Sequence, residues 1–291
     1  MLYVVRFFPE MTVKSRPVRM RLVKALRRNL RIILQRLDEK ISVVGNWDIL
    51  EVDTGDLDQA LESRVLDALL STPGISVVRP VEKLPLPESI DAIAESVLLH
   101  YRGALAGRTF VVRCKRTGTH AYSSGDIERQ VGGYLLHNSD AKGVDLINPE
   151  ITVRVEVRHN VLYVVKEQIN GLGGYPLGTQ EQVLSLISGG FDSAVSSFMT
   201  MRRGLQTHFV FFNLGGREHE FAVKEVALYL WMKFDSSHRV KFVSVPFEGV
   251  VTEITQKVDS GHMGVILKRQ MLRAAERIAI GMRLRALVTG E

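Results

Sequence analysis

The sequence is poor in cysteine and has no long apolar run. Cys114 is the only cysteine among 291 residues, so an internal disulfide is excluded and a cysteine-based zinc site is not expected. No stretch reaches the roughly 18 uninterrupted apolar residues of a membrane span, and Arg6 interrupts a start too short for a signal peptide. Hydrophobic residues make up 45% and charged residues 24%, which excludes a mainly disordered, collagenous or coiled-coil chain. A cytoplasmic protein with no membrane partner is the default prediction.

Positive charge is concentrated at the N-terminus. Residues 1–36 contain ten Lys or Arg and one acid, Glu10, while the rest of the chain sums to a net charge of −3. A basic end on a mildly acidic body favours a polyanionic partner, and nucleic acid is the natural candidate. Charge alone leaves a solvated helix face as an equal alternative.

Hydrophobic patterning predicts two α+β units before residue 168. Residues 2–8 are typical of a strand, and a helix is predicted from Pro17. Its apolar side chains recur at spacings of three and four, and five cations fall on the opposite face. The apolar set is Leu22, Leu26, Leu30, Ile33 and Leu37. Two short strands (41–44 and 49–52), a helix (57–70) and a strand (75–81) follow, and 84–87 is a predicted boundary.

The second unit has its own order of elements. A helix at 89–102, a strand at 108–115, a helix at 126–136 and a hairpin of 151–157 with 161–165 are predicted. The glycine-rich segment 168–180 is expected to be a linker or an ordered loop. Apolar strands then alternate with helices from 183 to 288, which indicates a parallel sheet covered on both faces.

The most informative segment is a glycine turn, SGGFDS at 188–193, between an apolar strand and a helix. Adjacent glycines allow a sharp turn and bring a ligand close to the backbone, and the amides at a helix N-terminus suit a phosphate. The turn lacks the Walker A lysine and is not G-x-G-x-x-G. Asp192 fits either a magnesium ion or a helix cap, and a plain strand-to-helix turn is the alternative.

This turn resembles the PP-loop of ATP pyrophosphatases, which cleave ATP to AMP and pyrophosphate while adenylating a carbonyl oxygen. Further segments narrow the resemblance: FFPEMTVKS, VRCKRTGTHAYSSGDIERQVGG, FFNLGG, GHMGVILKRQML and the terminal ALVTGE. Together they are similar to the bacterial tRNA 4-thiouridine sulfurtransferase family, in the family's order from residue 1 to 291.

The resemblance implies α+β N-terminal ferredoxin-like and THUMP domains, followed by an α/β Rossmann-like PP-loop domain whose parallel sheet is incomplete at the C-terminus. We expect the ferredoxin-like domain at 1–62, with about residue 80 as an alternative end, and an RNA-binding THUMP domain at 63–167. The linker is then 168–180, and the PP-loop domain is 181–291.

The function that the resemblance implies is ATP-dependent thiolation of tRNA. The first two domains would bind tRNA, and the enzyme would adenylate the C4 oxygen of the uridine at position eight. Persulfide sulfur would then displace AMP to give 4-thiouridine. ATP as substrate with Mg²⁺, a cysteine desulfurase as sulfur donor and a link to thiamine thiazole synthesis follow, and a homodimer stays open.

The resemblance also assigns residues to each role. Asp192 is the catalytic candidate, and no resident metal site is expected. ATP contacts are expected at Leu186, Ile187, Ser188, Gly189, Gly190, Ser193, Phe211, Phe212, Lys268 and Gly290. From the residues alone, Lys268 would be assigned to a solvated helix face. Contacts to tRNA are expected at Lys14, Arg21, Lys24, Arg27, Arg28, Arg31, Arg113, Lys115, Arg116, His120 and Arg129.

The sulfur chemistry departs from the family pattern. Members carry sulfur on cysteines in regions that have no counterpart here, and Cys114 is expected to be a small buried hydrophobe. The chain is therefore expected to be a fragment or a truncated homologue. Two alternatives stay open: a non-catalytic THUMP-containing tRNA-binding module with a vestigial PP-loop, and a PP-loop enzyme acting on a small metabolite, against which the basic first helix argues.

Overall fold

The computed structural model describes residues 1–290, which form two compact units. The first unit contains Met1–Val4, Glu51–Asp56 and Val78–Ile169. The second contains Val5–Leu50, Leu57–Val77 and the described chain from Asn170 onward. No helix among residues 1–290 combines the length and apolar character needed to cross a membrane.

The N-terminal elements alternate as βαββαβ. They are β1 (Leu2–Phe7), the short α1 (Pro9–Thr12), α2 (Arg16–Leu34), β2 (Ser42–Gly45), β3 (Leu50–Asp53), α3 (Gln59–Leu70) and β4 (Ile75–Pro85). Their strand order, β2-β3-β1-β4, is that of a ferredoxin-like fold.

Helix α2 buries the face that its spacing predicts. Leu22, Leu26 and Leu30 are fully buried, and Pro17 lies in the first turn as expected. The predicted apolar series extends one step too far, because the helix ends at Leu34 and Leu37 lies in the turn beyond it. The predicted boundary at 84–87 also overlaps a strand, since Leu84 and Pro85 still pair with β8.

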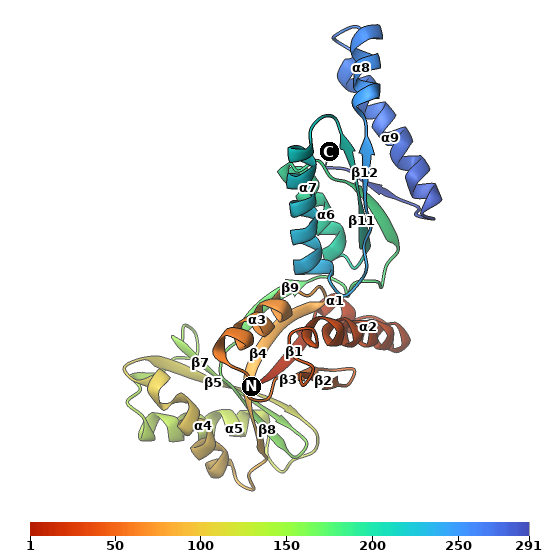
Figure 1. Cartoon of the computed structure of the whole chain (residues 1–291). Coiled ribbons are helices and arrows are strands. Elements are labelled where there is room, and N and C mark those ends of the chain that lie inside the picture. Colours follow the sequence, from red (N-terminus) through yellow and green to blue (C-terminus); the bar gives the residue numbers. More distant parts are fainter. Residues whose placement is uncertain (291) are drawn as a thin grey trace. The chain divides into compact units, whose positions relative to one another are not determined.

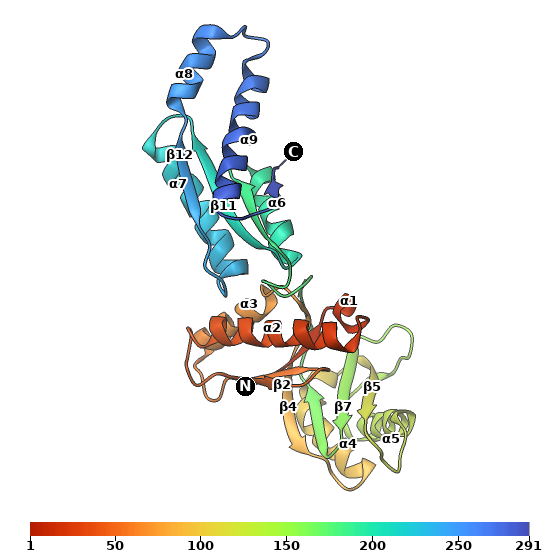
Figure 2. The same ribbon diagram turned by 90° about the vertical axis from the view of Figure 1, so that its right-hand side faces the viewer.

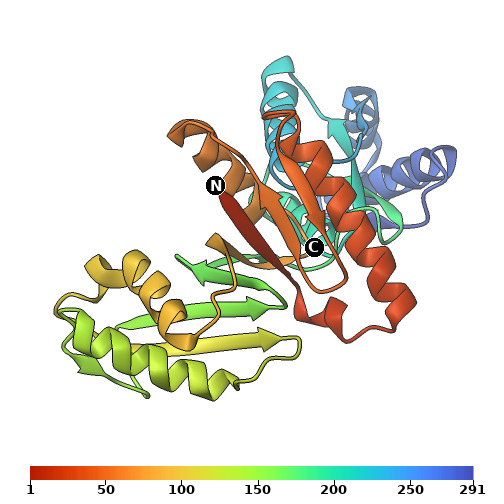
Figure 3. The ribbon, with the colours of Figure 1, turned by 90° about the horizontal axis from the view of Figure 1, so that it is seen from below.

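The following elements are α4 (Ile90–Leu105), β5 (Thr109–Thr117), α5 (Ser124–Asn138), β6 (Gly143–Val144), β7 (Ile151–Arg158) and β8 (Val161–Val165). Strands run in the order β4-β8-β7-β5-β6, and Figure 3 shows β5, β7 and β8 side by side. The predicted hairpin is confirmed, since β7 and β8 are antiparallel and His159 takes a positive φ at the turn. Helices α4 and α5 pack together on one face of these strands (Figure 1).

The C-terminal elements are β9 (Ile169–Gly173), β10 (Gln182–Leu186), α6 (Phe191–Arg202), β11 (Gln206–Asn213), α7 (Arg217–Leu230), a π-helical turn (Trp231–Asp235), β12 (Phe242–Pro246), α8 (Glu248–Lys257), α9 (Met263–Gly281) and β13 (Leu287–Val288). The glycine-rich segment is therefore ordered in part, because β9 pairs with β4.

The C-terminal sheet is parallel throughout, in the order β12-β11-β10-β13. Helices α6 and α7 cover one face, and α8 and α9 lie on the other, as Figures 1 and 2 show. Each face has its own apolar cluster, and both draw on β11. The predicted α/β parallel sheet is thus confirmed, and its carboxyl edge carries the glycine turn.

Candidate functional site

The glycine turn connects β10 to α6 through residues 187–190. Gly189 has φ +82°, which favours glycine, and a Cβ there would lie 2.9 Å from Cγ2 of Val223 on α7. Gly190 is the N-cap of α6, so no side chain caps the helix. The first amides of α6 are therefore left for a ligand, with the positive end of the helix dipole behind them.

Two serines hold the turn in shape. The buried Ser193 Oγ accepts the Ser188 amide at 3.2 Å and donates to the Gly190 carbonyl at 3.0 Å. The Ser188 Oγ lies 3.2 Å from the same hydroxyl, and Ser188 itself is exposed. Ser193 is thus committed to the turn, while Ser188 is the serine that a ligand can reach.

A pocket of about 420 Å³ opens beside this turn, at the carboxyl ends of β10 and β11. Its lining includes five of the residues assigned to ATP, namely Leu186, Ile187, Ser188, Phe211 and Phe212. Open parallel sheets bind ligands at this edge. The structure therefore brings together residues that lie about 25 positions apart in the sequence.

Gly290 reaches the same turn from the end of β13. A Cβ on Gly290 would lie 2.8 Å from the Ser193 amide nitrogen and 2.9 Å from the carbonyl carbon of Asp192. Only a residue without a side chain allows this close approach of two backbones. Gly290 is thus placed against the start of α6, next to the exposed Asp192.

Lys268 lies on an exposed face of α9, one turn before Met271, which lines the pocket. Asp192 lies at the first turn of α6 and is exposed. No group of three or more metal-ligating side chains exists within residues 1–290. Mg²⁺ that arrives with nucleotide phosphates needs only one or two carboxylates, so Asp192 fits that limited role.

The pocket also contains residues that the sequence reasoning did not assign. Leu214, Gly215, His219 and Met271 complete its lining, and the His219 ring lies 5.4 Å from that of Phe211. The segment FFNLGG supported the family resemblance, yet only its two phenylalanines were assigned to ATP. The loop after β11 was a usable signal, because loops at the carboxyl edge line such pockets.

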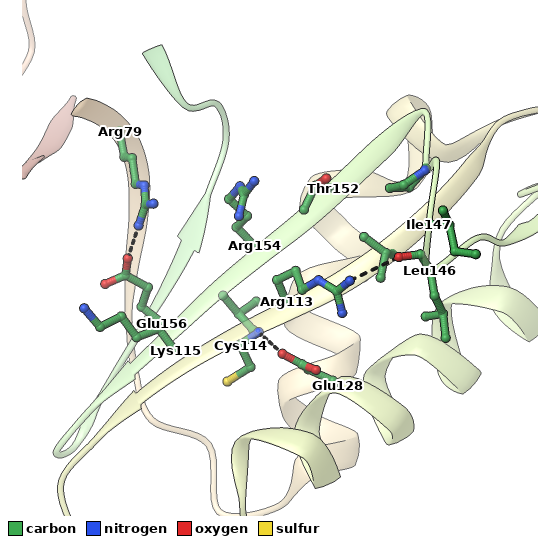
Figure 4. Close-up of a pocket in the computed structure, with 13 residues that line it drawn as sticks. Arg79, Arg113, Cys114, Lys115, Glu128, Leu146, Ile147, Thr152, Arg154 and Glu156 are labelled. Atoms are coloured by element: carbon green, nitrogen blue, oxygen red, sulfur yellow. Dashed lines mark hydrogen bonds and ion pairs between the residues drawn. The ribbon is translucent and has the colours of Figure 1, made fainter. Parts of the chain in front are cut away.

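A second hollow, of about 500 Å³, lies on the β5 and β7 strands (Figure 4). It contains the predicted Arg113 and Lys115 together with Arg79 and Arg154, which were not assigned. Arg113 on β5 is directly opposite Arg154 on β7. The alternation in ITVRVEVR could have revealed Arg154, since its valines face the core and its charged residues face the other side.

Charge in this hollow is positive on balance, with four cations against Glu128 and Glu156. Glu156 is almost fully buried and forms ion pairs with Arg79 and Arg158. Arg113 donates to the Leu146 carbonyl at 3.3 Å, and neither Arg113 nor Arg154 forms an ion pair among residues 1–290. These two arginines are the cations best placed for a polyanion.

Three other predicted RNA contacts lie outside that hollow. Arg116 bonds to the Gly118 carbonyl at 3.0 Å and lies 3.2 Å from Nδ1 of His120, whose Nε2 is 2.8 Å from the His159 carbonyl. Arg129 is largely exposed and pairs with Asp126 on α5. Arg116 and His120 therefore stabilise the 116–120 loop, and only Arg129 presents its charge to solvent.

The predicted basic face of α2 forms a third hollow, of about 470 Å³. It is lined by Arg21, Lys24, Arg27, Arg28 and Arg31 together with Gly178 and Thr179. Arg31 has a structural role as well, because its Nε and Nη2 both donate to the Val43 carbonyl, at 3.2 and 3.0 Å. Lys14 lies before α2 and lines a separate hollow with Arg16, Arg19 and Trp47.

Cys114 is half-buried, and its amide donates to Glu128 at 2.8 Å. Burial raises the pKa of its thiol to about 12, and the Glu128 carboxylate adds to the increase. The thiol is therefore protonated at neutral pH, and the reactive thiolate is disfavoured. In Figure 4 its sulfur points away from Arg154.

Comparison with known proteins finds two family matches. The family described as thiamine biosynthesis protein (ThiI) matches residues 178–291, which contain the glycine turn and the pocket. The THUMP domain family matches residues 87–166, which contain most of the second hollow.

Curated relatives extend the similarity to the rest of the chain. A tRNA sulfurtransferase of Azotobacter vinelandii is 53% identical over 99% of this chain. The chain is homologous to the tRNA sulfurtransferases. A tRNA sulfurtransferase of Escherichia coli O1:K1 is 51% identical over the whole chain. The chain spans 59% and 60% of the length of these two tRNA sulfurtransferases.

Solved structures share the fold. One, a 4-thiouridine synthetase in complex with RNA and with bound ATP, matches all of this chain and 73% of its own, with a TM-score of 0.83 and 23% identity. PH1313 from Pyrococcus horikoshii matches 88% of this chain and 82% of its own, with a TM-score of 0.70 and 24% identity. These two solved structures therefore share the fold of this chain.

Proposed function

We propose that this chain is the nucleotide- and RNA-binding part of an enzyme that uses ATP to thiolate a uridine of tRNA. One observation carries the proposal: five residues assigned to ATP line one pocket beside an uncapped helix N-terminus, and Gly290 packs against that helix. The similarity to tRNA sulfurtransferases, and to a 4-thiouridine synthetase solved in complex with RNA and ATP, supports it.

In the proposed first step the C4 oxygen of uridine attacks the α-phosphorus of ATP, and pyrophosphate leaves. The uncapped amides of α6 and of the turn would stabilise charge on the phosphates, and Asp192 would hold Mg²⁺ that accompanies the nucleotide. Lys268 would neutralise charge on the leaving pyrophosphate. Phe211 and Phe212 would flank the adenosine.

In the proposed second step the terminal sulfur of a persulfide attacks C4, the C–S bond forms, the C–O bond breaks and AMP leaves, so that the uridine is joined to the sulfur carrier by a disulfide. A second thiolate of the carrier would then attack the carrier sulfur, break this S–S bond, release 4-thiouridine and leave the carrier as a disulfide. Adenylation is needed because the C4 oxygen is otherwise a poor leaving group. Cys114 does not suit the sulfur-carrying role, because burial raises the pKa of its thiol. The sulfur would come from a cysteine desulfurase, and position eight of tRNA as target, cytoplasmic location and a link to thiamine synthesis belong to the same proposal.

The RNA would bind through phosphates and shape rather than through a base code. Arg113 and Arg154 in the THUMP match and the basic face of α2 supply charge for this binding. Such binding should weaken steeply with salt.

The test uses the full-length protein with a tRNA transcript and ATP. Asp192→Ala should lower tRNA-dependent pyrophosphate release by roughly a hundredfold, because the Mg²⁺ that neutralises the phosphates would lose its carboxylate ligand. Affinity for tRNA should stay unchanged. Glu225→Ala, which removes an exposed acid on α7, is the matched control and should behave as the wild type.

Two results would favour other functions. Salt-sensitive tRNA binding with no pyrophosphate release by the wild type would identify a non-catalytic tRNA-binding module. Absence of tRNA binding together with ATP cleavage driven by a small metabolite would identify a PP-loop enzyme of another class.

A further inference from the structure

A hollow at the N-terminal end of α2 is lined by an aromatic side chain, Trp47, which lies outside the hydrophobic core and has no role in the proposed chemistry. It measures about 450 Å³ and is lined by Lys14, Arg16, Arg19 and Trp47. The Trp47 side chain is 55% exposed, although tryptophan is usually well buried. All four residues lie within the same compact unit.

Trp47 is held in this position by a well-defined turn between β2 and β3. The Asn46 side-chain oxygen accepts the amides of Asp48 at 2.8 Å and Ile49 at 3.3 Å, and the Asn46 amide donates to the Ile49 carbonyl at 3.1 Å. The exposed indole is therefore presented by an ordered backbone.

The surrounding charges are arranged asymmetrically. The Arg19 guanidinium carbon lies 4.6 Å from the centre of the Trp47 ring, and Arg19 also pairs with Asp48 at 3.8 Å. Lys14 and Arg16 are exposed and have no ion-pair partner in the part of the chain described. No carboxylate lines the hollow. The charge of Arg19 is therefore compensated by Asp48, whereas the charges of Lys14 and Arg16 are available to a ligand.

An exposed aromatic ring beside uncompensated cations suits a single-stranded nucleotide, whose base stacks while its phosphates meet the cations. We propose that Trp47 is a stacking platform for an unpaired nucleotide of the RNA substrate, with Lys14 and Arg16 binding its flanking phosphates. The assignment rests on the proposed tRNA substrate and adds a contact to an unpaired base. Regular duplex RNA offers no free base face to this ring.

The first experiment uses Trp47 fluorescence in the full-length protein. This chain has two tryptophans, Trp47 and the half-buried Trp231. The substitution Trp231→Phe leaves Trp47 as the only tryptophan of this chain that emits. Tryptophans elsewhere in the full-length protein are likewise replaced by phenylalanine. A single-stranded RNA tetranucleotide and tRNA should quench the emission as they bind, whereas a blunt RNA duplex should leave it nearly unchanged. Binding of the tetranucleotide, followed by the anisotropy of a dye on the RNA, without quenching would overturn the proposal.

The second experiment compares substitutions. Trp47→Ala should weaken tetranucleotide binding roughly tenfold or more, and Trp47→Phe should keep most of the affinity because every aromatic ring can stack. Phe221→Ala removes an aromatic side chain that is 65% exposed on α7 and should have no effect. Equal loss in Trp47→Phe and Trp47→Ala, or no loss in either, would contradict a stacking role.

The outcomes also separate this proposal from the proposed function. If wild-type protein fails to bind tRNA, the tRNA substrate itself is wrong. The stacking platform alone is wrong if tRNA binds and supports pyrophosphate release, while bound RNA leaves Trp47 emission unchanged and the Trp47 substitutions leave tetranucleotide affinity unchanged.

Discussion

The pocket at the glycine turn and the hollow on β5 and β7 are built from different parts of the chain. The first depends on backbone: Gly189 and Gly290 allow close approaches, and an uncapped helix presents its amides. The second depends on side chains such as Arg113 and Arg154, which stand on the outer face of regular strands. A backbone site tolerates almost no change at its glycines, whereas a side-chain site distributes its binding energy over several replaceable cations.

The strongest test of this difference is Gly290→Ala. The new Cβ would lie 2.8 Å from the Ser193 amide and should displace the turn or the end of β13. Strain of this kind typically costs ~1–3 kcal/mol, so we expect ATP affinity to fall by up to roughly a hundredfold, measured by calorimetry. Affinity for tRNA should not change.

Gly281→Ala provides the matched control, because nothing lies within 4 Å of a Cβ at that position on α9. Unaltered ATP binding by Gly290→Ala would show that the turn is not the nucleotide site.

Two carboxylates, Asp235 at the end of the π-helical turn and Asp126 in the first turn of α5, should make stability depend on pH in opposite directions. Burial raises the pKa of Asp235 to about 8, and its carboxylate accepts a single hydrogen bond from residues 1–290, donated by the Thr207 amide at 3.3 Å. Because the folded pKa lies above the unfolded one, stability should fall as pH rises from about 4 to 8, by at most ~1.4 kcal/mol per pH unit. Asp235→Asn should flatten the dependence of the melting temperature between pH 6 and 8.

Asp126→Asn is the comparison for that experiment. Hydrogen bonds from Ser123, and then from Arg129, lower the pKa of Asp126 to about 2. Its contribution is present above pH 4 and is lost only as pH falls toward 2. A wild-type melting temperature that is constant from pH 6 to 8 would contradict a buried, protonated Asp235.

Single cations of the second hollow should matter less. Arg113→Ala or Arg154→Ala should each weaken tRNA binding roughly threefold and reduce the slope of log K against log salt by about one, because one phosphate contact is lost. Filter binding at several salt concentrations measures both quantities. Arg102→Ala, on α4 at the helix-covered face, should leave the slope intact.

The smallest expected effect concerns the cap of α5. The Ser123 side chain accepts the Asp126 amide, and Asp126 bonds back to the Ser123 amide at 2.8 Å. Ser123→Ala should lower the free energy of unfolding by about 1 kcal/mol, measured by urea denaturation. Ser124→Ala, one residue later, removes a hydroxyl outside this pair and should be nearly neutral. An equal loss of unfolding free energy in Ser124→Ala would show that the effect of Ser123→Ala does not come from the cap.

The elements were predictable where local patterning and packing agree. The apolar face of α2, the hairpin of β7 and β8 and the alternating parallel part all follow from periodicity in the sequence. Element ends were less predictable. Leu37 continues the spacing beyond α2, and β4 extends through Leu84 and Pro85, because pairing with β8 continues the strand there.

The candidate site was predictable only in part, because local patterning does not show which distant elements pack together. The glycine turn is local, so its sequence indicates its conformation. Leu214, His219 and Met271 join the pocket through separate elements, and Arg79 and Arg154 join the second hollow through strand pairing. Trp47 and Lys14 are far apart in sequence and meet in one hollow. No short motif carries such contacts.

By itself, the sequence determined the α/β order, the glycine turn before α6 and the basic face of α2, since each depends on residues a few positions apart. Tertiary structure alone decided which of these residues share a pocket, that Gly290 contacts α6, and that Arg31, Arg116 and His120 stabilise local structure. The physical reason is that periodicity encodes which face of an element is buried, whereas a binding site is defined by which elements pack against one another.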